Sequence, residues 1–121
     1  MGSRVALLFR FNDIRVSTAI MNEIGPPQYV HMYVDKNRLR LYIRACEWDA
    51  DAFRVNRRAI RNTSTGYSMH SKEIMNMLFS LMKLEDRDIC IKCWHQIVDY
   101  RTIEVDLNDY RETDKHNMGR R

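Results

Sequence analysis

The chain contains two kinds of hydrophobic pattern: apolar positions with a period of two, typical of β-strands, and apolar stripes at helical spacing. The clearest alternation runs through residues 29–34 and 38–44, which are separated by the turn residues Asp35-Lys36-Asn37, and it predicts a β-hairpin. Further strands are predicted over residues 5–11, 14–16, 89–94 and 101–107, and helices over residues 18–24 and 72–84.

One six-residue pattern, S-x-x-I-M-N, occurs twice, first at Ser17 and again 54 positions later at Ser71. Each copy begins a predicted helix that is followed by two strand-like segments. A fixed offset between two similar orders of elements indicates an internal duplication. We therefore expect an α+β fold of two pseudo-symmetric strand–helix–β-hairpin units, which form a small antiparallel sheet or barrel with two helices.

The 121 residues are enough for one domain, which we expect over residues 4–107. The two units are expected over residues 4–44 and 67–107, joined by a basic connector over residues 45–66. The polar residues 108–121 are expected to form a flexible tail.

The basic residues of the chain are mostly arginines, 15 Arg against 5 Lys, and the net charge is +4. Arginine forms planar, two-pronged hydrogen bonds with phosphates and carboxylates, which lysine cannot do. The excess therefore favours a nucleic acid or an acidic protein surface as the partner. A charge of this size is equally compatible with a protein that is merely kept in solution by it.

The sequence predicts neither a membrane protein nor a secreted one. No apolar segment approaches the ~20 residues of a membrane-spanning helix, and residues 5–9 are too short for a signal-peptide core. Three cysteines without the spacing of a disulfide framework fit a reducing compartment. We expect a cytoplasmic protein.

The outward face of the predicted hairpin alternates basic and aromatic residues: Arg38, Arg40 and Arg44 with Tyr33, Tyr42 and His31. This combination suits phosphate contacts together with stacking on bases. The same alternation also occurs on solvated faces of antiparallel sheets, where tyrosine and arginine pack across strands.

A second basic group lies in the connector. If residues 54–61 were helical, Arg54, Arg58 and Arg61 would share one edge, with Arg57 beside them. Such an edge could follow a DNA backbone or bind an acidic protein. The alternative is that these arginines pair with the acidic residues just upstream, Glu47, Asp49 and Asp51.

Residues 14–25, followed by the hairpin from Tyr29 to Ile43, resemble the swapped-hairpin unit of the AbrB family. In that family a strand carrying an arginine leads into a brief helix that ends at a glycine, and MraZ-like members carry two units in one chain. The resemblance implies a small DNA-binding barrel, with Arg15 at the family's basic position. Ser17 stands where the family usually has proline, and Met69-His70 replaces the arginine-bearing pair in the second copy.

No catalytic motif is present, so we expect a non-enzymatic protein without a cofactor or metal. The first functional hypothesis is an AbrB-like DNA-binding regulator that uses Arg15, Arg38, Arg40 and Arg44, supported by Arg57, Arg58 and Arg61. The second is an inhibitor or adaptor of a phage or mobile element, such as an anti-CRISPR protein. It would bind a nucleic-acid-handling protein such as a nuclease, through the arginines or the methionine-rich helix 72–84. A homodimer is compatible with either hypothesis.

Overall fold

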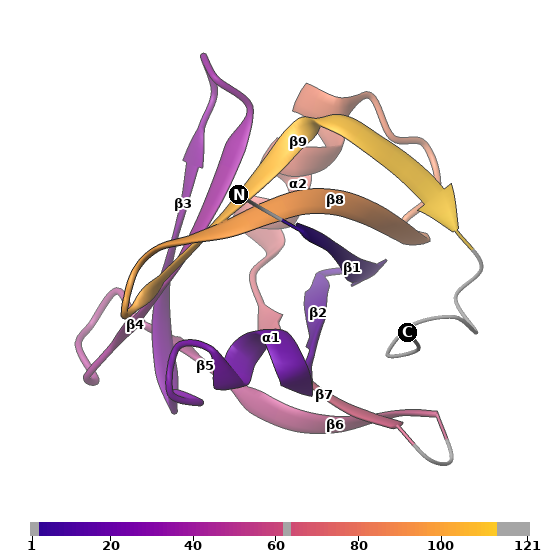
Figure 1. Cartoon of the computed structure of the whole chain (residues 1–121). Helices are drawn as coiled ribbons and strands as arrows, with labels where there is room; N and C mark the ends of the chain where they lie inside the picture. Colours follow the sequence, from indigo (N-terminus) through magenta and orange to yellow (C-terminus); the bar gives the residue numbers. More distant parts are fainter. Residues whose placement is uncertain (1–2, 62–63, 114–121) are drawn as a thin grey trace.

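The computed structural model describes residues 3–61 and 64–113, which form nine strands and two helices (Figure 1). The elements are β1 (Ser3–Arg10), β2 (Asp13–Ser17), α1 (Thr18–Asn22), β3 (Tyr29–Asp35), β4 (Arg40–Cys46), β5 (Phe53–Arg54), β6 (Asn56–Arg61), β7 (Ser64–His70), α2 (Lys72–Met82), β8 (Asp88–Asp99) and β9 (Thr102–Thr113). Neither described helix is long and apolar enough to cross a membrane.

All the strands belong to one antiparallel sheet with the order β5-β3-β4-β9-β8-β1-β2-β7-β6. The two end strands, β5 and β6, are separated along the chain only by Val55, whose N–H donates to the carbonyl oxygen of Gln28 at 2.9 Å. The chain itself therefore joins both ends of the strand order. The result is a nearly closed, barrel-like sheet, with α1 and α2 towards opposite ends of the molecule (Figure 1).

The prediction of an α+β fold was wrong, because the structure is mostly β. Its two helices are short, with 5 residues in α1 and 11 in α2. The predicted strand–helix–hairpin unit was also wrong, because a hairpin precedes each helix, β1–β2 before α1 and β6–β7 before α2. The strands predicted over residues 5–11 and 14–16 are confirmed as β1 and β2. The missing strands lie within residues 45–66, which we had interpreted as a connector.

The helical interpretation of residues 54–61 was wrong as well. Arg54 lies in β5, and Arg57, Arg58 and Arg61 lie in β6, which pairs antiparallel with β7. The helical spacing of three arginines takes account only of residues within the segment. A strand is stabilised by hydrogen bonds to a neighbouring strand, which this spacing does not reveal. That neighbour, β7, begins a few residues further along the chain.

The last hairpin is longer than the sequence indicated. We expected a connection over residues 95–100 and a tail from residue 108, but β8 continues to Asp99 and β9 to Thr113. A short turn at Tyr100 and Arg101 joins them, and the polar end of β9 pairs with the first half of β8. Residues 114–121 of the expected tail lie outside the described part of the chain.

The interior of the barrel is filled by alternate residues of the strands and by one side of α2. Val30, Met32 and Val34 of β3 are buried, as are Leu41 and Ile43 of β4, as their alternation predicts. Helix α2 contributes five buried side chains: Ile74, Met75, Leu78, Phe79 and Met82. Because these alternate residues of β3 and β4 point into the core, the residues between them point outward and form an outer surface.

Candidate functional site

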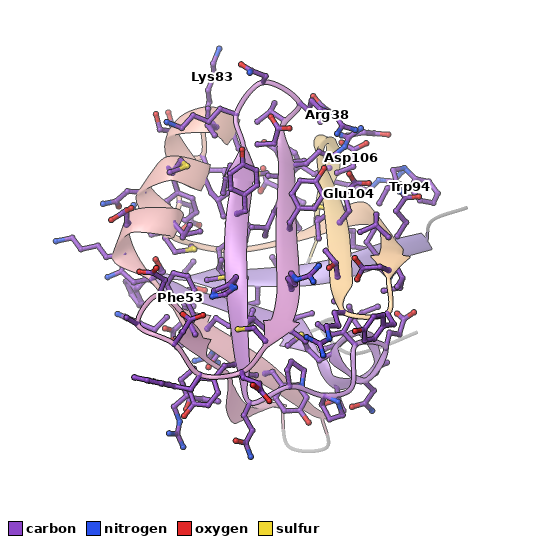
Figure 2. The ribbon with its side chains drawn as sticks, turned by 90° about the vertical axis from the view of Figure 1, so that its left-hand side faces the viewer. Arg38, Phe53, Lys83, Trp94, Glu104 and Asp106 are labelled. Carbon is purple, nitrogen blue, oxygen red and sulfur yellow. The ribbon has the colours of Figure 1, made fainter. Side chains whose placement is uncertain are left out.

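The outward-facing side chains of β3, β4, β9 and β8 form one surface, which we call the outer face. Cross-strand register arranges it in three rows: Asp35–Arg40–Asp106–Trp94, Tyr33–Tyr42–Glu104–Gln96 and His31–Arg44–Thr102–Asp99. Figure 2 views this side of the molecule, with β3 and β4 in front and β9 beside them. The predicted arginines and tyrosines of the first hairpin thus meet the residues of a hairpin about 60 positions away.

Glu104 lies at the centre of the outer face, and its side chain is only 10% exposed. Its carboxylate accepts a hydrogen bond from the Tyr42 hydroxyl at 2.6 Å and another from the Gln96 amide at 2.6 Å. Arg38 and Arg40 lie 3.9 and 4.0 Å from the same carboxylate (Figure 2). The bond from Tyr42, then that from Gln96 and the two arginines, lower the pKa of Glu104 against the opposing effect of burial. The same bond raises the pKa of Tyr42.

Two further carboxylates of the outer face form ion pairs with Arg40 and Arg44. Arg40 Nη1 lies 2.5 Å from Asp106 Oδ1, and Arg44 Nη1 lies 3.4 Å from Asp99 Oδ2. Arg44 also donates to the Thr102 hydroxyl at 3.3 Å. The pKa of Asp99 is lowered first by the N–H of Arg101, then by Thr102, with Arg44 adding to the effect.

The outer face is therefore not a free basic surface, which differs from our expectation. Arg38, Arg40 and Arg44 each have a carboxylate oxygen within 4.0 Å. The three rows contain four acidic residues, which offset these three positive charges: Asp35, Asp99, Glu104 and Asp106. A polyanion approaching this side would meet a compensated network rather than unpaired guanidinium groups.

The two predicted aromatic residues of the face differ in their availability. The rings of Tyr33 and Tyr42 lie 6.1 Å apart between centroids. Tyr33 is 63% exposed, whereas Tyr42 is half-buried, donates to Glu104 and accepts from Arg38 at 3.3 Å. Tyr33 is therefore the better placed of the two to stack on a ligand.

Arg15, the residue indicated by the AbrB resemblance, lies in β2, which is not one of the strands of the outer face. Its side chain is 15% exposed and stands 4.0 Å from Asp13. Its Nε atom is buried and has no hydrogen-bond partner among the described residues. Arg15 thus presents little surface to DNA in this structure.

The structure places Arg57, Arg58 and Arg61 apart from the outer face, in β6, while their side chains lie outside its described part. Their strand pairs with β7 along the lower edge of the molecule in Figure 1, far from the turn between β3 and β4. The sequence around them is unusual: residues 52–72 contain five basic residues and no acidic one. We call this segment the basic hairpin.

Three possible metal ligands, which the sequence patterns did not connect, lie together at one end of the outer face. His31, Cys46 and Asp49 each offer one ligand atom, and these atoms all lie within 4.8 Å of one another. The pKa of Asp49 is lowered first by the N–H of Asp51 and further by His31. Burial, followed by the charge of Asp49, raises the pKa of the Cys46 thiol.

Part of this group could have been found from the sequence. His31 and Cys46 have outward parity on the two strands of the predicted hairpin, but the predicted second strand ended at Arg44, two residues too early. Asp49 was considered only with Glu47 and Asp51, because nothing in the spacing linked it to a histidine. No protein-family model, curated protein or solved structure matches this chain, so the AbrB resemblance stays a prediction.

The methionine-rich helix α2, considered as a binding surface, uses most of its apolar residues in the core. Met75 is fully buried and Met82 is 7% exposed, while Met77 and Leu81 are only partly buried. The surplus of apolar residues on this helix is thus largely explained by the barrel interior.

Proposed function

We propose that the chain is a non-enzymatic nucleic-acid-binding module, with duplex DNA as its first candidate ligand, and that it binds through the basic hairpin. The charge distribution carries this proposal. The whole chain has 20 basic and 16 acidic residues; without the basic hairpin, 15 basic and 16 acidic residues are left. The positive excess of the protein therefore resides in residues 52–72.

Contacts between arginines and phosphates supply most of the affinity of non-specific DNA binding. β6 is an end strand of the sheet order, and it carries Arg57, Arg58 and Arg61 over six residues. A phosphate backbone that follows this strand could contact all three arginines. The outer face, by contrast, has its arginines paired with carboxylates.

The test compares two triple variants that remove the same charge. Fluorescence anisotropy with a labelled random-sequence DNA duplex would be measured at low and moderate salt for the wild-type protein, for Arg57→Gln/Arg58→Gln/Arg61→Gln and for Arg38→Gln/Arg40→Gln/Arg44→Gln. We expect the β6 variant to lose about tenfold or more in affinity. Its slope of log affinity against log salt should fall by about 0.9 for each lost phosphate contact.

The control variant should bind within a few-fold of wild type. Equal losses in both variants would mean that only net charge matters, which would overturn the assignment to the basic hairpin. A larger loss in the control would return the site to the outer face. A wild-type protein that does not bind the duplex, even at low salt, would reject DNA binding altogether.

A specific observation supports a second candidate function, that of an adaptor or inhibitor that binds a nucleic-acid-handling protein. Tyr100 is 76% and Trp48 is 70% exposed, and Ile97 and Val98 near Tyr100 are also exposed. Tyr100 lines a surface hollow of about 400 Å³ together with Glu47, the neighbour of Trp48. Aromatic residues are enriched in protein interfaces, so this group fits a protein partner.

That function is tested by titrating the protein into DNA-loading assays of purified RNA-guided nucleases. Inhibition that Trp48→Ser/Tyr100→Ser removes, while Phe11→Ser retains it, would support the protein-binding function. Phe11 is a suitable control because it is 64% exposed and lies in the turn between β1 and β2. Inhibition that survives the loss of both aromatic residues would argue against this surface.

A further inference from the structure

His31 and Cys46 are held on the same side of the sheet by strand register. His31 is opposite Arg44, and Cys46 is opposite Tyr29, so the two residues are diagonal neighbours on β3 and β4. Alternation in both strands directs their side chains outward, since Val30 and Ala45 beside them are buried. Diagonal positions of this kind are within reach of each other's side chains.

Asp49 comes from the turn that follows β4, and this turn fixes the orientation of its carboxylate. Asp49 Oδ1 accepts the N–H of Asp51 at 2.8 Å, and its carbonyl oxygen accepts the N–H of Ala52 at 3.2 Å. The other carboxylate oxygen, Oδ2, lies 2.8 Å from His31 Nε2. This Asx-type turn holds the carboxylate in place and leaves Oδ2 directed at His31.

The three donor atoms lie close enough together for one small cation to bind all of them after small movements. They are an imidazole nitrogen, a sulfur and a carboxylate oxygen. Zinc binds these atoms at about 2.0–2.3 Å in a tetrahedral arrangement, which places neighbouring ligand atoms roughly 3.3–3.7 Å apart. The donors now lie within 4.8 Å of one another. The side chains of His31 and Asp49 are 42% and 48% exposed, so both have room for the small adjustment required.

We propose that His31 Nε2, Cys46 Sγ and a carboxylate oxygen of Asp49 form a zinc-binding site, with water as the fourth ligand. Imidazole and thiolate ligands favour zinc over magnesium or calcium, which prefer oxygen ligands. On binding, the Cys46 thiol loses its proton to solvent and a Zn–S bond forms. The hydrogen bond between His31 Nε2 and Asp49 is broken, and the Nε2 proton passes through solvent to Nδ1, so that the neutral imidazole binds the cation through the Nε2 lone pair. One carboxylate oxygen of Asp49 then bonds to the same cation.

Cobalt provides the direct test, because a Co²⁺–thiolate bond gives a charge-transfer absorption that the metal-free protein lacks. The full chain, reduced and freed of metal with a chelator, would be titrated with Co²⁺ and then with Zn²⁺. We expect one equivalent of Co²⁺ to produce the thiolate band and Zn²⁺ to displace it. Cys46→Ser should abolish the band, and His31→Gln and Asp49→Asn should each weaken Zn²⁺ binding by about tenfold or more.

The chain contains a matched control for this experiment. His70 and Asp13 form a second exposed His–Asp pair at 2.8 Å, from His70 Nδ1 to Asp13 Oδ1, and no cysteine belongs to that pair in the structure as described. His70→Gln should therefore leave both the band and the Zn²⁺ affinity unchanged. A thiolate band that survives Cys46→Ser would assign the metal to another cysteine and overturn the proposal.

Thermal unfolding adds an independent readout. Because the three ligands come from β3, β4 and the following turn, Zn²⁺ should raise the melting temperature of the wild-type protein. It should raise that of Cys46→Ser markedly less, while the two metal-free proteins melt at similar temperatures. An equal rise in both proteins would contradict binding at these three residues.

Discussion

β4 and β6 are two strands rich in arginine, and they differ in the strands that lie beside them. β4, with Arg40 and Arg44, is hydrogen-bonded to β9, whose outward residues include Glu104 and Asp106. β6, with three arginines, is hydrogen-bonded to β7, whose seven residues include no acidic one. One set of positive charges is therefore compensated by its neighbour, and the other has no acidic residue on its paired strand.

The difference shows that local arginine density is a poor guide to a basic surface. Both strands have a basic sequence, with two arginines in β4 and three in β6, but the electrostatic potential depends on cross-strand neighbours. For β4, the decisive neighbour is Glu104, which lies 62 positions beyond Tyr42 in the chain. Removing the carboxylates that pair with these arginines should therefore change both the stability of the outer face and its charge.

The largest effect on stability is expected from removing the central carboxylate. Glu104→Ala removes the carboxylate that lies beside Arg38 and Arg40, and it removes the acceptor of the Tyr42 hydroxyl and of the Gln96 amide. Loss of one partner from a fully buried ion pair destabilises proteins by about 3 kcal/mol or more. Because Arg38 is 60% exposed, we expect a loss of about 2–3 kcal/mol, which urea unfolding would measure. The variant should also bind DNA slightly more tightly than wild type, because the outer face loses one negative charge.

Asp106→Ala is the control for this prediction, since its side chain is 30% exposed compared with 10% for Glu104. Its loss should reduce stability by about 1 kcal/mol or less. If the two substitutions had equal effects, Glu104 would not be the centre of the network.

A smaller loss is expected from removing one hydroxyl group. Tyr42→Phe keeps the ring but deletes the hydrogen bond to Glu104, which should lower the free energy of unfolding by about 1–2 kcal/mol. Tyr33→Phe on the facing strand is the matched control and should stay within about 0.5 kcal/mol of wild type, because Tyr33 is largely exposed. Equal losses in the two variants would show that the hydroxyl bond contributes little.

The parts of the fold that follow from local pattern were predictable from the sequence. The β3–β4 hairpin was identified by period-two alternation, since Val30, Met32, Leu41 and Ile43 are all buried. A helix was predicted to begin at each S-x-x-I-M-N copy, and at the second copy the Ser71 hydroxyl accepts the N–H of Ile74 at 3.1 Å. Ser17 is the N-cap residue of α1 at the first copy, but its side chain makes no capping hydrogen bond. The second half of β9 was missed, because polar residues become a strand there only by pairing with β8.

The candidate sites depend even more on contacts between distant residues. Alternation placed Arg40 and Arg44 correctly on an outward face, but nothing local indicated that β9 would align Asp106 with Arg40. Asp49 lies in a turn, where no periodicity constrains the direction of a side chain, so its approach to His31 could not be predicted. The sequence thus predicts which face of a sheet a residue occupies more readily than which residues it contacts.

Acidification should weaken the same network, with a smaller effect than either substitution, because a protonated Glu104 stays in place and can still accept hydrogen bonds. Its pKa in the folded protein is lowered below the ordinary value of 4.5, first by the bond from Tyr42. The carboxylate therefore contributes stability that is present above about pH 4.5 and is lost as the pH falls through the folded-state pKa.

Unfolding curves of wild type and Glu104→Gln between pH 6 and the acid limit would isolate this contribution, since glutamine has no proton to gain. We expect the difference in stability between the two proteins to shrink on acidification. A difference that stays constant with pH would show that Glu104 does not titrate with folding.

The smallest effect is expected for the pair at the edge of the face. Arg44 and Asp99 have side chains that are 53% and 44% exposed and lie 3.4 Å apart, so solvent screens their attraction. A double-mutant cycle of Arg44→Gln and Asp99→Asn should give a coupling close to the error of the measurement. Asparagine keeps the oxygen that accepts the N–H of Arg101 at 2.8 Å, so the turn is preserved in the cycle. The same cycle for Arg40 and Asp106, which are less exposed, should give a larger coupling; the opposite order would mean that burial does not set the strength of these pairs.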